Sequence, residues 1–162
     1  MPTNRQMQPA RTSLYTAVER ARRDATRWTL VQGILAPIQF IAFAVSLVLV
    51  LHCLATGNGY QAAARSVVVK TGLLYLIMIT GAIWEKEVFG QYLFAPAFFW
   101  EDVFSFAVIA LHTLYLYGLM TGAIAPHGLM LIALAAYATY VVNAGQFILK
   151  LRRARLDMAV AA

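Results

Sequence analysis

Three acidic residues stand where long apolar runs end or begin, which is an expensive place for an ionised carboxylate. Glu85 closes one run, and the neighbours Glu101 and Asp102 open the next. Carboxylates at such positions are usually paired or functional, because their charge is poorly solvated. Desolvation also helps a carboxyl group to keep its proton near neutral pH, so that it can act as a general acid. The three residues therefore indicate proton transfer to an apolar substrate.

Polar side chains continue along one helical face from Glu101. Ser105 and His112 follow it by four and eleven residues, and eleven residues make about three helical turns. We expect this face to look into a helix bundle. His112 would lie about 16 Å beyond Glu101, from the helical rise per residue. It is either a buried, hydrogen-bonded histidine or a ligand to the metal of a bound pigment.

Amides and aromatic rings gather at the same level of the expected bundle. Asn143 and Gln146 are spaced to share a face of the last apolar run, and interhelical hydrogen bonds alone would explain them. Trp84, Phe99 and Trp100 flank the acidic residues. Together with the carboxylates, these side chains suit a site with aromatic walls at one end of the bundle.

The composition excludes most other classes of protein. The chain has 162 residues, of which 61% are hydrophobic and only 12% are charged, about half the charged share of a soluble domain. The net charge of +6 comes from residues near the two ends, so it does not indicate a face that binds nucleic acid. Cys53 is the only cysteine. No zinc-ligand spacing, phosphate-binding glycine loop, serine elbow or dinucleotide fingerprint occurs.

Four apolar runs must position the polar groups, and each is long enough to cross a bilayer as a helix, which takes about 20 residues. We expect the spans at about 29–54, 66–84, 98–120 and 129–149. The predicted fold class is all-α, an integral membrane bundle of four transmembrane helices. Its membrane domain covers residues 29–150, after an N-terminal segment at 1–28 and before a tail at 151–162.

Basic residues set the expected orientation of the bundle. They are concentrated near the two ends of the chain: Arg5, Arg11, Arg20, Arg22, Arg23, Arg27, Lys150, Arg152, Arg153 and Arg155. The connection after the first span carries only Arg65, and the one after the third span carries none. The positive-inside rule then places both termini in the cytoplasm, which requires an even number of spans. Lys70, inside the second span, is expected to extend its ammonium group to the opposite interface.

Three stretches of the sequence are similar to one known family. They are LYLIMITGAIWEK at 74–86, FGQYLFAPAFFWEDVFS at 89–105 and YVVNAGQF at 140–147. On these runs the chain resembles the 3-vinyl bacteriochlorophyllide hydratase family, over nearly its whole length past about Leu14. The central run is long enough to be specific.

The resemblance implies a hydro-lyase of bacteriochlorophyll biosynthesis in a bacterial inner, photosynthetic membrane. Such an enzyme adds water across the 3-vinyl group of a chlorophyllide and forms the 3-(1-hydroxyethyl) product. It needs no separate cofactor, since the magnesium belongs to the substrate. Its expected partners are the tetrapyrrole, the bilayer and other enzymes of the pathway, and no nucleic acid. The resemblance assigns no catalytic residues, so the roles that follow are physical inference.

Hydration of a vinyl group needs a proton at the terminal carbon and water at the inner carbon. The cation between these steps is delocalised into the macrocycle, so the reaction calls for a general acid and a nearby anion. We expect Glu85, Glu101 and Asp102 to supply them. Successive helical residues point about 100° apart, which favours Glu85 paired with one of the other two. Which carboxyl group is acid and which is base stays open.

The remaining candidates are expected to bind the substrate. Trp84, Phe99 and Trp100 would stack on the ring, Asn143 and Gln146 would place water or bind carbonyl groups with Ser105 beside them, and His112 would bind the magnesium.

Two alternatives stay open on these residues. A non-enzymatic pigment-binding or assembly protein would use His112 and the aromatic rings without the carboxylates.

The second alternative is a small proton-coupled transporter with an intramembrane carboxylate. It fits less well, because the acidic residues cluster at one interface and transporter sites usually lie near mid-membrane. A haem protein with His52 and His112 as paired ligands is weaker still, since the two histidines should lie at different depths.

Overall fold

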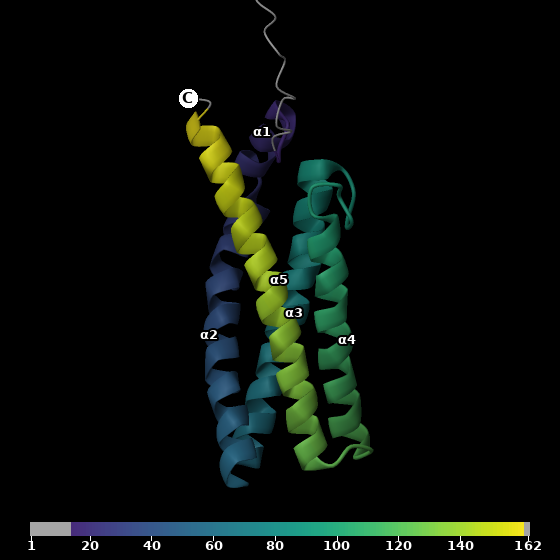
Figure 1. The fold of residues 1–162 in the computed structure, drawn as a ribbon. Helices are drawn as coiled ribbons and strands as arrows, with labels where there is room; N and C mark the ends of the chain where they lie inside the picture. The colour runs from purple at the N-terminus through teal and green to yellow at the C-terminus, as the bar shows by residue number, and fades with distance from the viewer. Residues whose placement is uncertain (1–13, 161–162) are drawn as a thin grey trace, which may run out of the picture.

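Five helices make up the chain in the computed structural model, which describes residues 14–160 and side chains as far as Leu156 (Figure 1). They are α1 (Ala17–Ala25), α2 (Arg27–Thr56), α3 (Tyr60–Phe89), α4 (Phe99–Thr121) and α5 (Pro126–Val160). No strand occurs in this part of the chain, so the all-α prediction is confirmed for it. Arg5 and Arg11, counted above for the orientation, lie outside the described residues.

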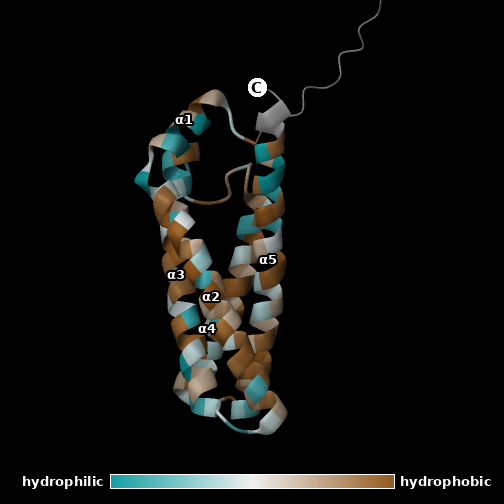
Figure 2. Cartoon of the chain, turned by 90° about the vertical axis from the view of Figure 1, so that its left-hand side faces the viewer, coloured by the Kyte–Doolittle hydropathy of each residue, from teal (hydrophilic) through white to brown (hydrophobic). Residues whose placement is uncertain are grey.

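Helices α2 to α5 are the four expected membrane spans. Three of them have 30, 30 and 23 residues, and the apolar part of α5, Pro126–Leu156, has 31. All four are long and apolar enough to cross a bilayer. Figure 2 shows hydrophobic residues along the middle of the bundle and hydrophilic ones concentrated on α1, on the adjacent end of α5 and near the opposite turns. The four predicted spans are therefore confirmed as helices. Helices α2, α3 and α5 are longer than expected, and α4 has the expected length of 23 residues.

The spans form two antiparallel hairpins, α2 with α3 and α4 with α5, which pack side by side (Figure 1). The short α1 lies against α3 at the end of the bundle where α5 also finishes. The described beginning and end of the chain therefore lie at the same end of the molecule, as an even number of spans requires. We call this the terminal end.

The interior of the bundle is small, and much apolar surface faces outward. Near the opposite end, Phe43 and Val50 of α2 pack with Tyr115 of α4 and Tyr137 of α5. Large side chains such as Leu30, Val48 and Ile148 are more than half exposed. A soluble monomer rarely exposes so much contiguous apolar surface, whereas lipid tails cover it without cost. The outer faces of the four helices are therefore suited to lipid.

Lys70 corrects one expectation. Its side chain is 0% exposed, and Nζ lies 4.0 Å from the centre of the Tyr140 ring instead of reaching the opposite interface. Because α3 begins at Tyr60, Lys70 lies about three turns inside the helix, on the face that α5 covers. The ring face of Tyr140 stabilises the ammonium group. No described side chain or backbone group hydrogen-bonds to Nζ.

Candidate active site

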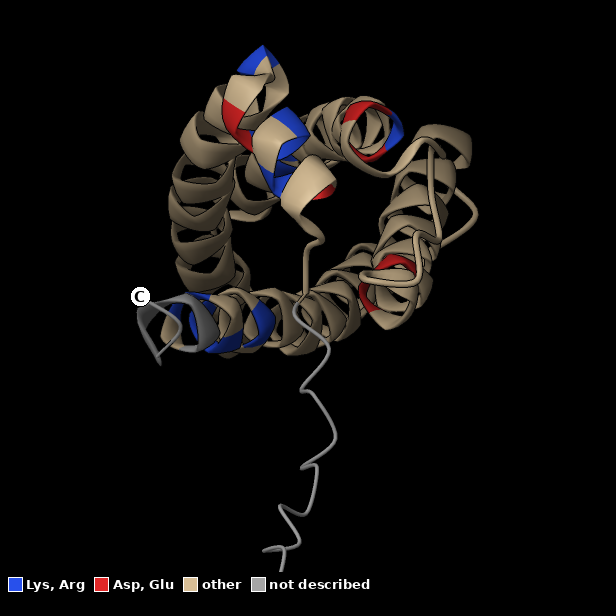
Figure 3. Cartoon of the chain, turned by 90° about the horizontal axis from the view of Figure 1, so that it is seen from above, with Lys and Arg blue, Asp and Glu red and all other residues tan. Residues whose placement is uncertain are grey.

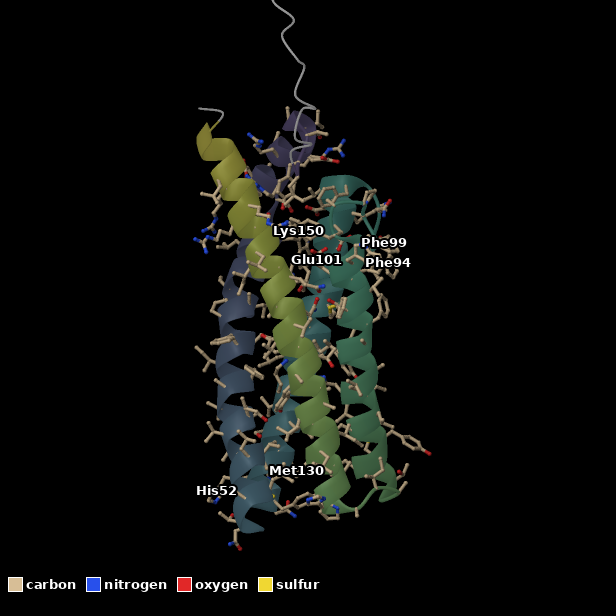
Figure 4. The ribbon with its side chains drawn as sticks, in the orientation of Figure 1. His52, Phe94, Phe99, Glu101, Met130 and Lys150 are labelled. Atoms are coloured by element: carbon tan, nitrogen blue, oxygen red, sulfur yellow. The ribbon has the colours of Figure 1, made fainter. Side chains whose placement is uncertain are left out.

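Glu101 of α4 and Lys150 of α5 point toward one another near the terminal end (Figure 4). Lys150 Nζ lies 2.5 Å from Oε2 of Glu101 and donates a second hydrogen bond of 2.5 Å to the carbonyl oxygen of Ala97. The side chain of Glu101 is only 6% exposed. An ion pair with this geometry is strong, because both partners are charged and little water competes. Its cation was predicted only as a membrane-flanking residue.

A cavity of about 380 Å³ opens beside this ion pair. Its walls are formed by Leu14, Glu101, Gln146, Leu149, Lys150, Arg153 and Ala154. Most of these residues belong to α5, and Glu101 is the one acidic group among them. Ligand sites typically measure about 300–1,000 Å³ and combine apolar walls with a few polar groups. This cavity fits that description, although a whole tetrapyrrole is larger, so only an edge of such a ring would enter it.

Glu85 of α3 and Asp102 of α4 form a second acidic group at the same end. Both are buried, with 5% and 3% of their surface exposed. Their carboxyl groups are hydrogen-bond partners of each other, and Glu101 lies close enough to act electrostatically on both. Two carboxyl groups can share a hydrogen bond only when one of them keeps a proton. The structure therefore brings all three predicted acids together, and Glu85 and Asp102 lie close enough to share a proton.

The loop at 90–98 is tied to this acidic pair. Asp102 Oδ2 accepts a hydrogen bond of 2.6 Å from the backbone N–H of Phe94, and Glu85 Oε2 accepts one of 3.3 Å from Ala95. Phe94 has a φ of 59°, in the left-handed region, which costs a residue other than glycine about 1 kcal/mol or more. The ring of Phe94 stacks on Phe106 at 5.4 Å. The carboxylates and this stacking hold a strained turn in place.

Ser105, Asn143 and Gln146 lie about one turn deeper than the ion pair. Asn143 Nδ2 donates to Ser105 Oγ at 2.8 Å, which joins α5 to α4. Asn143 Oδ1 and Gln146 Oε1 are buried and accept no hydrogen bond from the described residues. Buried amide oxygens normally have a partner. These two acceptors therefore suit a water molecule or a donor on a ligand, and Gln146 reaches the cavity itself.

Trp84 belongs to an aromatic cluster next to the ion pair. Its ring lies 5.7 Å from that of Phe98, which stacks on Phe147 at 5.8 Å and has Lys150 Nζ 5.1 Å from its centre. Trp84 Nε1 also donates to Thr29 Oγ1 at 2.9 Å. The cluster therefore positions Lys150 from one side, and Trp84 contributes through Phe98 without lining the cavity.

Phe99 and Trp100 lie elsewhere. They are 43% and 65% exposed and contact each other, with ring centres 5.5 Å apart. Figure 4 shows Phe99 on the outer side of α4 with Phe94, directed away from Lys150. The structure does not bring these two rings to the cavity. They face the region that lipid would occupy.

His112 is enclosed deep in the bundle. Its Nδ1 lies 2.8 Å from the carbonyl oxygen of Val108 and so must donate a proton, and its Nε2 has no partner among the described residues. The free lone pair would suit a metal, but His112 does not line the cavity. His52 is exposed at the opposite end (Figure 4). Within residues 14–156, no three His, Cys, Asp or Glu side chains are arranged to hold a metal ion.

Comparison with known proteins identifies the family of this chain. The family model described as 2-vinyl bacteriochlorophyllide hydratase matches residues 15–153. The chain belongs to this family. It is 74% identical over 149 residues to the 2-vinyl bacteriochlorophyllide hydratase of Cereibacter sphaeroides, covering 91% of this chain and 92% of that protein.

A second relative supports the same assignment. The chain is 69% identical over 160 residues to the 2-vinyl bacteriochlorophyllide hydratase of Rhodobacter capsulatus, covering 98% of this chain and 92% of the relative. No solved structure matches the chain. The resemblance predicted from the three sequence runs is confirmed, with the vinyl position numbered 2 in the family name. The chain is thus a hydratase of bacteriochlorophyll biosynthesis, and the carrier and transporter alternatives give way to it.

Proposed function

We propose that this hydratase adds water across the vinyl group of a bacteriochlorophyllide-type tetrapyrrole at the terminal end of the bundle. The observation that carries the proposal is the gathering of three buried acids, Glu85, Glu101 and Asp102, of which Glu101 lines a cavity with an ion pair in its wall. Glu85 and Asp102 lie behind Glu101 and do not line the cavity. The substrate named for the relatives is a large apolar ring with one reactive side group. A cavity at the end of a lipid-facing bundle can receive the edge of such a ring while the rest stays in the apolar region.

The reaction needs only acid–base chemistry. A proton adds to the terminal vinyl carbon, the carbon–carbon π bond breaks, and the positive charge moves to the inner carbon and into the ring. Water then forms a carbon–oxygen bond at the inner carbon and loses a proton to a base. Nothing is oxidised or reduced overall, and the magnesium arrives with the substrate. We therefore propose no separate cofactor.

The two acidic groups suit the two proton transfers. The adjacent carboxyl groups of Glu85 and Asp102 can share one proton, and we assign to this pair the delivery of the proton to the terminal carbon. Glu101 is paired with the Lys150 ammonium group, so it is the anion that stabilises the cation and accepts the proton of the attacking water. The free oxygens of Asn143 and Gln146 would hold that water. His112, Phe99 and Trp100 have no part in this scheme.

The charges at the terminal end support a cytoplasmic location for the site. Seen from above that end, Lys and Arg are grouped on α1 and on the last turns of α5 (Figure 3). The positive-inside rule then places the terminal end in the cytoplasm. We propose that the protein resides in the inner photosynthetic membrane, where other enzymes of the pathway would deliver the vinyl substrate and receive the alcohol.

Labelled water tests the proposed reaction directly. The purified protein in detergent, incubated with a vinyl chlorophyllide in ¹⁸O-water, should give a product heavier by one labelled water, with the label in the new hydroxyl group. Glu101→Gln should lower kcat by about 100-fold or more, the usual loss when an acid–base group is removed. Glu87→Gln is the matched control, because Glu87 is exposed. Binding of the vinyl substrate without formation of the labelled product would contradict the proposal. Full turnover by Glu101→Gln would contradict it as well.

A further inference from the structure

The cavity beside Glu101 has more positive than negative charge in its walls. Lys150 and Arg153 line it from α5, and Glu101 is the one acid that faces them. The ion pair with Glu101 uses the charge of Lys150. Arg153 forms no ion pair with any side chain that the structure describes. Within the described side chains, one positive charge of the cavity therefore has no paired anion.

The two cations are arranged to hold one anion together. They are three residues apart on α5 and so project from one face of the helix. An ammonium group has three donors, and Lys150 uses two of them, on Glu101 and on the carbonyl oxygen of Ala97. Its third donor is free for a ligand. The guanidinium group of Arg153 offers a planar fork that matches a carboxylate.

The rest of the wall favours an anion that belongs to an apolar molecule. Leu14, Leu149 and Ala154 supply apolar surface around the two cations. A small inorganic anion would leave this surface without a partner. A carboxylate on a hydrophobic ring would contact both kinds of group. Arg152, Arg153 and Arg155 are all exposed, but among them only Arg153 lines the cavity, so the other two serve as ordinary membrane-flanking charges.

We propose that Lys150 and Arg153 bind the free carboxylate of the tetrapyrrole, and so select the acid over its esters. The inference rests on the proposed function, because a bacteriochlorophyllide carries an unesterified propionate side chain. Binding that group at the two cations fixes the ring in one orientation in the bundle. It also offers the Lys150 ammonium group a second carboxylate, which loosens its hold on Glu101 when substrate is present.

Paired substrates that differ only in this charge test the inference. Vinyl chlorophyllide and its methyl ester are compared as substrates of the wild-type protein, and of the Arg153→Gln and Arg152→Gln variants. Wild type should favour the acid in kcat/KM by about tenfold, mostly through KM, since a good charged contact contributes about 1.4 kcal/mol. In Arg153→Gln this preference should fall to about one. In Arg152→Gln it should keep the wild-type value.

The outcomes separate this inference from the proposed function. Turnover of the ester by Arg153→Gln shows that the variant is folded. Equal use of acid and ester by wild type, or an unchanged preference in Arg153→Gln, overturns the carboxylate site while the hydratase activity stands. Failure of wild type to hydrate either compound overturns the proposed function itself. The two cations could instead bind the phosphate of a lipid. Activity of the wild-type protein would then depend on anionic lipid, and the preference for the acid would be the same in wild type and Arg153→Gln. That result also overturns the inference.

Discussion

At the scale of single residues, Glu101 and Asp102 are neighbours in sequence with different partners. Their side chains leave α4 about 100° apart, so one meets Lys150 of α5 and the other meets Glu85 of α3. The first is held as an anion by a cation. The second lies beside another carboxyl group, with which it can share a proton. Adjacent positions on one helix thus provide the base and the acid of the proposed reaction.

Two substitutions of Asp102 distinguish the chemical role of the acidic pair from its structural role. Asp102→Asn keeps an oxygen that can accept the Phe94 N–H but cannot share a proton with Glu85, so kcat should fall by about 100-fold or more with little loss of stability. Asp102→Ala removes the acceptor as well, and should also lower the free energy of unfolding by roughly 1 kcal/mol or more. Product formation and the midpoint of thermal unfolding in detergent measure the two effects. Wild-type turnover by Asp102→Asn would show that the pair only holds the loop.

Lys70 provides a prediction about stability alone. Its ammonium group is buried and has no hydrogen-bond acceptor among the described residues, and a methionine of similar length would remove that cost. Lys70→Met should raise the free energy of unfolding by about 1 kcal/mol, net of the lost contact with the Tyr140 ring. Thermal unfolding in detergent measures it, with turnover as a control. A clear loss of stability would mean that the ammonium group has a partner, such as an internal water, that matters more than its burial.

At the scale of elements, the loop at 90–98 links the two helices that carry the acids. Gly90 ends α3 with a φ of 85°, a left-handed conformation that side chains disfavour. From there the chain turns back, so that its Phe94 and Ala95 amides reach the two carboxylates. The glycine therefore determines where the loop meets the acidic pair.

Gly90→Ala should destabilise the protein by about 1 kcal/mol and reduce turnover, because the added Cβ forces the loop away from its conformation. Gly33→Ala is the matched control, since Gly33 lies inside α2 with open space around it and no left-handed backbone. That variant should be as stable as wild type or slightly more so. Thermal midpoints and turnover of the two variants can be compared directly. Equal behaviour of both would remove the loop from the proposed mechanism.

Much of this architecture could be predicted from the order of residues, for clear physical reasons. A run of about 20 apolar residues has few alternatives to a membrane helix, and helical spacing places Glu101 and Ser105 on one face. Lys150 and Lys70 could not be assigned in this way. A lysine at a helix end looks like any flanking cation, and a lysine within a span looks as if it should reach the interface. Only the packing of α5 shows that both point inward.

At the scale of the whole molecule, the charges and the site lie at the same end of the bundle (Figure 3). A cytoplasmic terminal end predicts the accessibility of two positions. In a Cys53→Ala background, a cysteine at Asn58, in the turn between α2 and α3, should react with a membrane-impermeant thiol reagent applied from outside the inner membrane. A cysteine at Arg152 should react only after the membrane is opened. The reverse pattern would invert the orientation and put the site on the outer side.

The two-hairpin arrangement also bears on how the protein is made. Glu85 is synthesised with the first hairpin, before its partner Asp102. Glu101 is likewise synthesised before its partner Lys150, which lies near the end of the last span. During synthesis the membrane therefore holds acidic side chains whose counterparts have yet to arrive. A chain interrupted before the final helix would keep uncompensated carboxyl groups in lipid, a defect that membrane quality control can recognise.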